Sequence, residues 1–158
     1  MTRWLTPDEQ RAWRGLQSMT SQLQARLNRE LQKHSGLSLA DYDVLVRLTD
    51  APGGRLRVYE MVQDLQWEQS RLSHHVARMQ RRGLVAREEC ATDRRGAFIL
   101  LTATGRRVIE QAAPAHVETV RRLVFDELPA ESVTALELLS THVLARLNES
   151  APPPESAS

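Results

Sequence analysis

Basic side chains that could bind a polyanion gather in one stretch, SRLSHHVARMQRRGLVAREECATDRRGAFILLT, at residues 70–102. From Trp67 to Arg82 there are four arginines and one glutamate. A guanidinium can donate paired hydrogen bonds to the acceptor atoms of guanine or to a phosphate, and a serine hydroxyl can bond to either. Over residues 126–158 the balance reverses, with six acidic residues and one arginine. Any polyanion should therefore meet the middle of the chain.

An apolar stripe and a polar face divide the helix expected over residues 69–82. Wound at about 100° per residue, Leu72, Val76 and Met79 fall on one narrow stripe. The opposite face can enter the major groove of DNA, although any surface helix of an arginine-rich chain has a similar composition. His75 lies at the edge of the stripe, where we expect it to pack. The candidates for DNA contact on this helix are Ser70, Arg71, Ser73, His74 and Arg78.

A second basic group, Asp93-Arg94-Arg95-Gly96, lies between two apolar runs, LVARE and AFILL. The two runs predict a two-stranded hairpin, and glycine permits the chain reversal between them. Arg94 and Arg95 are candidates for DNA contact, because narrow A·T stretches of the minor groove concentrate negative potential. Asp93 is expected to hold one arginine or a backbone amide and so to stiffen the turn.

Helix signals surround this basic middle. Thr6 can cap a first helix in which Glu9 completes a capping box, so we expect a long helix over about residues 7–34, ended by Gly36. A helix, a short turn, a second helix and a hairpin form a winged helix-turn-helix. A second helix is expected to begin at Ser38 and to end at Ala51-Pro52-Gly53-Gly54, and two more are expected over 57–66 and 69–82. A fifth helix is expected to begin at Ala103, capped by Thr102 and kinked at Pro114, and a last one to follow Leu128-Pro129.

Length and composition limit the class of protein. The 158 residues predict one domain over 1–150 and, from the composition APPPESAS, a disordered tail over 151–158. No apolar run approaches the roughly 18 residues of a membrane span. Cys90 is the only cysteine, which favours a reduced, cytoplasmic setting. Motifs of phosphate loops, metalloproteases and nucleophile elbows are absent from the sequence, so we expect no enzyme, no cofactor and no metal site.

The chain resembles MarR-family transcriptional regulators. LSLADYDVLVRL, SRLSHHVARMQRRGLVARE and TDRRGAFILLTATG carry the resemblance, which extends over most of residues 5–148. It implies a mainly α fold, with a winged DNA-binding part over about 37–101 and dimerisation helices over about 5–34 and 103–148. It also implies a homodimer that binds a palindromic operator in double-stranded DNA. Family members usually repress transcription until a small ligand or an oxidation event releases them.

Residue by residue, the resemblance places Ser70, Arg71, His74 and Arg78 on the DNA-facing side of the recognition helix. It assigns Arg95 to the minor groove and Asp93 to bracing the wing. Two positions depart from the family pattern. Glu68 stands where a serine-type cap is common, and His75 stands where an aliphatic residue is usual.

The resemblance also implies an effector site between the dimerisation helices and the winged part. Side chains suited to an aromatic or phenolic effector there are Trp13, His34, Tyr42 and His116, although residues of these types are more often simply part of a core. Two alternatives stay open. Cys90 could make the regulator redox-responsive, although Glu88 and Glu89 disfavour its thiolate. The chain could also be a helical dimeric protein-interaction module without specific DNA binding.

Overall fold

The computed structural model describes residues 1–89 and 96–149. Cys90, Asp93, Arg94, Arg95 and the predicted tail at 151–158 lie outside the described residues. Internal contacts divide the chain into two compact units, Met1–Thr119 and Val120–Ser158, which are treated separately below. Within the described part of the chain, no helix is long and apolar enough to cross a membrane.

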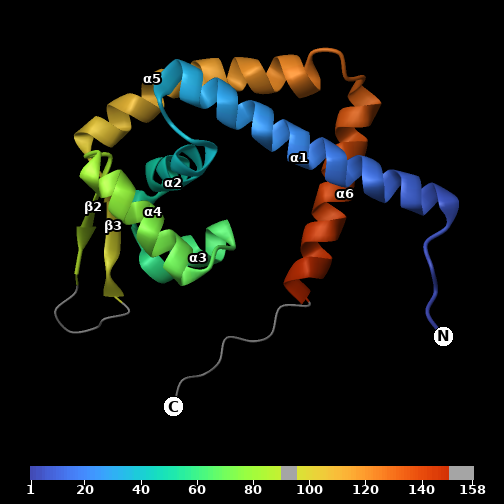
Figure 1. The fold of residues 1–158 in the computed structure, drawn as a ribbon, viewed down its shortest axis with the longest axis horizontal. Helices are drawn as coiled ribbons and strands as arrows, with labels where there is room; N and C mark the ends of the chain where they lie inside the picture. Colours follow the sequence, from blue (N-terminus) through green and yellow to red (C-terminus); the bar gives the residue numbers. More distant parts are fainter. Residues whose placement is uncertain (90–95, 150–158) are drawn as a thin grey trace. The chain divides into compact units, whose positions relative to one another are not determined.

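The first unit is mainly helical, with one small sheet (Figure 1). Its helices match the predicted order, and α5 extends one residue past the boundary between the units. The elements are α1 (Pro7–Ser35), α2 (Leu39–Asp50), a 3-10 turn (Pro52–Gly54), β1 (Arg55–Arg57), α3 (Val58–Leu65), α4 (Gln69–Arg81), β2 (Val85–Glu88), β3 (Phe98–Leu101) and α5 (Ala103–Val120).

Local sequence sets the ends of α1. The Thr6 hydroxyl accepts a hydrogen bond from the Glu9 amide at 3.2 Å, and the Glu9 carboxylate accepts one from the Thr6 amide at 2.7 Å. At the other end Gly36 has φ 68°, the left-handed conformation that glycine adopts without a Cβ penalty. Both predicted boundaries of the first helix are confirmed to within one residue.

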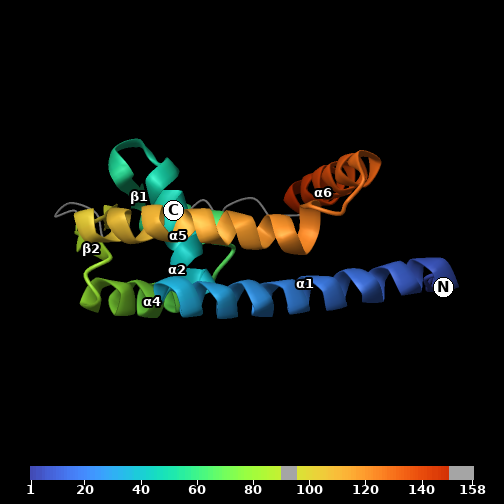
Figure 2. The ribbon, with the colours of Figure 1, turned by 90° about the horizontal axis from the view of Figure 1, so that it is seen from above.

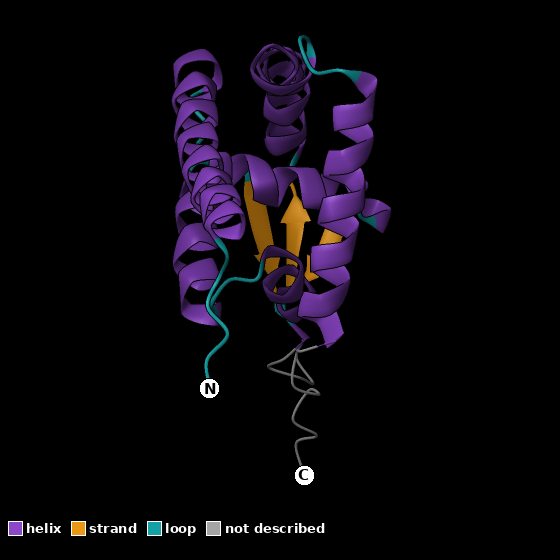
Figure 3. Ribbon diagram, turned by 90° about the vertical axis from the view of Figure 1, so that its right-hand side faces the viewer, coloured by secondary structure: helices purple, strands orange, loops and turns teal. Residues whose placement is uncertain are grey.

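The sheet has three antiparallel strands in the order β1-β3-β2 (Figure 3). Phe98 on β3 pairs with Glu88 on one side and with Arg57 on the other. The two predicted wing strands are present, and β1 joins them as a third strand that the sequence pattern does not predict. With three residues, Arg-Leu-Arg, β1 is too short to show a strand period, and it runs directly into α3.

The core of the first unit lies where α2, α3 and α4 meet the sheet. Leu45 of α2 and Met61 of α3 are fully buried, as is Ile99 of β3 at 1% exposure. From α4, Leu72, Val76 and Met79 enter the same cluster, which confirms the predicted apolar stripe. The core therefore fixes α4 from one side and leaves its other side open.

The C-terminal end of α1 lies against the second half of α5, where Leu31 and His34 line one hollow with Ala112 and His116, and Figure 2 shows both helices. Pro114 lies inside α5, which continues as helix to Val120. Towards the N-terminus, α1 carries apolar side chains that the chain does not cover. The exposed ones on α1 are Trp13, Leu16 and Met19, and Trp4 and Leu5 are exposed just before the helix begins.

The second unit begins with a π-helical turn (Arg121–Phe125) and continues into α6 (Ala130–Glu149). The predicted last helix beyond Pro129 is thus confirmed. Its apolar side chains are largely solvent-accessible in the single chain. The exposed ones on α6 are Val133, Leu138, Leu139, Val143, Leu144 and Leu147.

Candidate nucleic-acid interface

One face of α4 presents polar side chains to solvent. The core holds the other face, so that Ser70, Arg71, His74 and Arg78 are all exposed, as the helical period predicts. Ser73 differs from them. It is half-buried and lines a small hollow at the edge of α4, next to Val58 of α3 and Arg87 of β2.

Arg71 is held against an aromatic ring. Its guanidinium carbon lies 4.2 Å from the ring centroid of Trp67, a cation–π geometry. Trp67 in turn meets the imidazole of His75 edge-on, with 5.4 Å between ring centroids. Trp67 precedes α4 and is half-buried, so it supports the first turn of this helix from beside the core.

His75 is buried at 7% exposure, which confirms that it faces the protein rather than solvent. Its Nδ1 atom lies 2.9 Å from Nη2 of Arg78, and its Nε2 atom lies 3.0 Å from Oδ1 of Asp41. The second contact has ion-pair distance but lacks the alignment of a good hydrogen bond. His75 thus connects α2 to an exposed arginine of α4.

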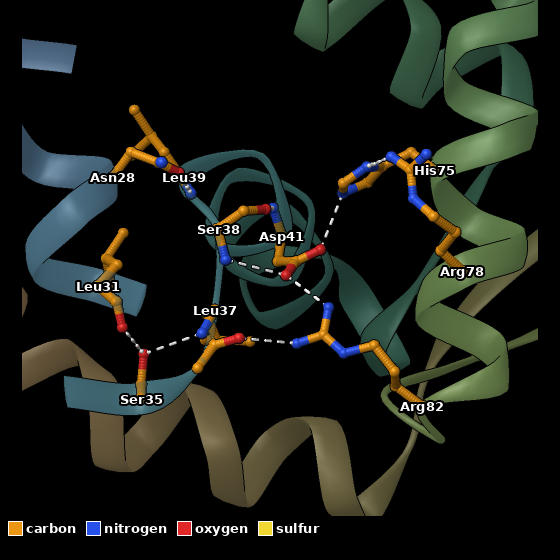
Figure 4. A network of polar contacts seen from close by, with 11 residues as sticks. Asn28, Leu31, Ser35, Leu37, Ser38, Leu39, Asp41, His75, Arg78 and Arg82 are labelled. Carbon is orange, nitrogen blue, oxygen red and sulfur yellow. Dashed lines mark hydrogen bonds and ion pairs between the residues drawn. The ribbon is translucent and has the colours of Figure 1, made fainter. Parts of the chain in front are cut away.

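Asp41 contacts His75, Arg82 and Ser38 and so connects them in one polar network (Figure 4). Its carboxylate accepts hydrogen bonds from Nη1 of Arg82 at 2.6 Å and from the Ser38 amide at 3.0 Å. Burial by itself raises the pKa of Asp41, but the contacts with His75, Arg82 and Ser38 outweigh it and hold the pKa well below its usual range. Asp41 is therefore a buried carboxylate that stays ionised.

Arg82 joins three helices at one point. One nitrogen bonds to Asp41 of α2, and Nη2 donates to the carbonyl oxygen of Gly36 at 3.0 Å. Gly36 is the residue that ends α1, whereas Arg82 is the residue that ends α4. The orientation of α4 is thus tied both to α2 and to the end of α1 (Figure 4).

Further arginines surround the base of the wing. Arg55 and Arg57 of β1 place their guanidinium carbons 3.9 and 4.9 Å from the ring centroid of Phe98 on β3. Arg87 of β2 is exposed. The sequence pattern does not single out Arg55 and Arg57, because only the pairing of β1 with β3 brings them to the wing.

The wing is anchored to the start of α5. The Thr102 hydroxyl lies 2.6 Å from the Gly83 carbonyl and 2.9 Å from the Leu84 carbonyl, and it accepts a hydrogen bond from the Gly105 amide at 2.9 Å. This cap confirms the predicted role of Thr102. It fixes the start of the hairpin relative to α5.

Three of the four predicted effector residues lie together, between α1, α2 and α5. His34 and His116 line one hollow with a cavity volume of about 10 Å³, and the ring centroids of Tyr42 and His116 lie 4.2 Å apart. Burial lowers the pKa of His116, although Asp43 opposes the shift. Trp13 does not line this hollow. It lies on the exposed first half of α1.

Comparisons with known proteins fit this geometry. A profile of the MarR family matches residues 35–96. The transcriptional regulator HosA of Escherichia coli O127:H6 is 33% identical over 104 residues, which cover 66% of this chain and 73% of HosA. This chain belongs to the MarR family. The resemblance seen in the recognition helix and wing is thereby confirmed.

Two solved MarR-family structures extend the match to nearly the full chain. AbsC from Streptomyces coelicolor is 38% identical, with a TM-score of 0.87 over 94% of this chain and 100% of AbsC. Sco3205 from the same organism, solved in complex with DNA, is 38% identical, with a TM-score of 0.85 over 99% of this chain and 96% of Sco3205. The MarR-family fold, with its winged helix-turn-helix, is therefore the architecture of this protein.

Proposed function

We propose that this MarR-family protein is a sequence-specific, ligand-responsive repressor that binds a palindromic operator as a homodimer. The observation that carries the proposal is the solvent face of α4, where Arg71, His74 and Arg78 stand clear of a core that fixes the helix. Their donors suit the major-groove edges of base pairs, and the arginines suit guanine. The DNA complex of Sco3205, a relative of similar fold, supports the same role for this chain.

The homodimer is supported by apolar side chains that one chain leaves uncovered. Met19 is 53% exposed on α1, while Leu144 is 58% exposed on α6. Each of the two helices carries several exposed apolar side chains, and exposed apolar patches commonly mark protein–protein interfaces. A two-fold dimer would present its two recognition helices to half-sites about one helical turn, roughly 34 Å, apart.

An aromatic acid is the effector class that we propose. The hollow between α1 and α5 offers imidazoles at His34 and His116, with the Tyr42 ring against the latter. Its cavity volume of about 10 Å³ is far below the roughly 300–1,000 Å³ typical of ligand pockets, so binding would require the lining side chains to move apart. Exposed His34 can do so without disturbing the core.

Selection of bound duplexes from a random library tests the function. The winning duplex would then be titrated by fluorescence anisotropy at several salt concentrations. An enriched palindrome, with affinity that falls steeply as salt rises, is the expected result. No enrichment, with only weak salt-dependent binding, would contradict sequence-specific regulation and favour a protein-interaction module.

A further inference from the structure

His75 is a buried polar side chain directly beneath the exposed face of α4. A buried imidazole costs free energy unless its nitrogen atoms have partners. At 7% exposure the ring has little access to water, and its two nitrogens lie near two charged groups, one positive and one negative. The Arg78 guanidinium faces Nδ1, whereas the Asp41 carboxylate faces Nε2 (Figure 4).

The contact with Arg78 defines the protonation state of the ring. A guanidinium has only donors, so Nδ1 of His75 must accept the 2.9 Å hydrogen bond and carry no proton. The single proton of the neutral ring is then on Nε2, which faces Oδ1 of Asp41 at 3.0 Å. An ionised carboxylate at this distance stabilises that tautomer, as a carboxylate does behind other orienting histidines.

The order of partners therefore runs from Asp41 through His75 to Arg78. Asp41 is itself fixed by the Ser38 amide and by Arg82, which leaves the carboxylate little freedom to turn. Trp67 closes the other side of the imidazole with its ring edge. Of the three residues in this order, Arg78 is the one whose side chain is exposed, on the solvent side of α4.

We propose that His75 is a positioning residue for base recognition, whose neutral imidazole, with Asp41 behind it, holds the Arg78 guanidinium ready on the DNA-facing side of α4. This inference rests on the proposed function, because it requires Arg78 to read a base. One donor of Arg78 is used by His75, and the remaining donors of the guanidinium stay available for a base edge. A long arginine side chain fixed in advance loses less conformational entropy when DNA binds.

The test compares base discrimination in two substitutions that each keep half of the His75 contacts. In His75→Asn the amide oxygen can take the place of Nδ1 and accept from Arg78. In His75→Gln the amide reaches the place of Nε2 and keeps the contact with Asp41, but offers no acceptor at Nδ1. Each variant is titrated against the selected operator and against operators altered at the base pair that Arg78→Ala identifies.

We expect His75→Gln to lose discrimination at that base pair by about two- to tenfold, the cost of immobilising one long side chain on binding. His75→Asn should keep most of it, and thermal unfolding should show both variants folded. In the Arg78→Ala background, where discrimination at that pair is already lost, His75→Gln should cause no further loss of it. Binding to random duplex should be the same for wild type, His75→Gln and His75→Asn.

Three outcomes would overturn the proposal. They are wild-type discrimination in His75→Gln, equal losses in both His75 variants, and an additional loss from His75→Gln in the Arg78→Ala background. Should wild-type protein enrich no duplex at all, the proposed function itself fails and the role of His75 fails with it. Enrichment by wild type together with any of the three outcomes would reject only the positioning role.

Discussion

Gly105 of α5 and the Leu84 carbonyl oxygen approach each other so closely that no side chain fits between them. A Cβ atom placed on Gly105 would overlap that oxygen and would stand 3.0 Å from Cδ1 of Leu101. The obstacle is backbone, which cannot rotate away as the end of a flexible side chain can. Together with the Thr102 cap, this contact fixes the position of the start of β2 relative to the first turn of α5.

Gly105→Ala should therefore destabilise the fold, by about 1–3 kcal/mol or more, because the backbone must shift to admit a methyl group. Urea unfolding followed by circular dichroism measures the change. Gly15→Ala is the matched control. Nothing lies within 4 Å of a Cβ there, so this substitution inside α1 should stabilise by about 0.5–1 kcal/mol. Equal effects of the two substitutions would contradict the close contact.

Arg71→Ala should relax sequence preference rather than remove DNA binding in general. An arginine that makes a paired contact with guanine is worth about 1–3 kcal/mol against the wrong base, and Trp67 holds this one in place. Competition titrations with operators altered one base pair at a time check it. Arg29→Ala, an exposed position on α1, serves as control. If Arg71→Ala weakened specific and random duplexes by the same factor, Arg71 would contact phosphate instead.

Met19→Glu should weaken the proposed dimer at least tenfold, equivalent to about 1.4 kcal/mol, since a carboxylate would enter an apolar interface. Sedimentation equilibrium measures the dissociation constant. Gln17→Glu adds the same charge to the other side of α1 and should leave association nearly unchanged. A monomeric wild-type protein, or equal effects at both positions, would refute this interface.

Asp41→Asn should destabilise the protein at neutral pH by about 1–3 kcal/mol, since the amide cannot satisfy Arg82 and His75 as a carboxylate does. The folded-state pKa of Asp41 lies below its ordinary value of 3.8, so the ionised carboxylate contributes stability above that pH. This contribution falls as the pH drops below about 3.8 towards the folded-state pKa. The difference between wild type and variant, measured by urea unfolding, should accordingly shrink in acid. A difference that is independent of pH would exclude an ionised Asp41 as its source.

Benzoate, as a simple aromatic carboxylate, should bind more tightly as the pH is lowered from 8 to 6. Burial lowers the pKa of His116, so its imidazole is largely uncharged at neutral pH in the free protein and gains a proton when a carboxylate binds. Linkage to one proton limits the increase in affinity to about tenfold per pH unit. Calorimetric titration checks it, with uncharged benzyl alcohol as the pH-independent control. His116→Phe should reduce the pH dependence for benzoate.

Most of the helices and strands could be predicted from local sequence patterns. The Thr6–Glu9 capping box and the glycine at 36 determine the limits of α1 through groups at most four residues apart, so they can be seen in the sequence. The stripe of Leu72, Val76 and Met79 likewise reports which face of α4 is buried. β1 escapes prediction because three residues are stabilised as a strand only by β3, which follows about 40 residues later.

The exposed residues of the candidate site could be predicted from the sequence, but the buried contacts that position them could not. Periodicity places Arg71 and Arg78 on the open face of α4 and His75 on the buried one. It cannot indicate that His75 meets Asp41 or that Arg82 reaches Gly36, since these contacts connect residues far apart in the chain. Such contacts depend on how α1, α2 and α4 pack, which no local pattern encodes.

The contacts of Arg82 with Asp41 and Gly36 also determine which positions of α4 can be changed to alter DNA specificity. Because α4 is attached through its buried stripe and its last residue, the exposed positions 70, 71 and 74 can be exchanged as a cassette without altering the attachment. Position 78 belongs to a different class, because its side chain bonds to His75. Libraries that aim to retarget this scaffold should therefore randomise positions 75 and 78 as one linked pair, and leave Asp41 and Arg82 as they are.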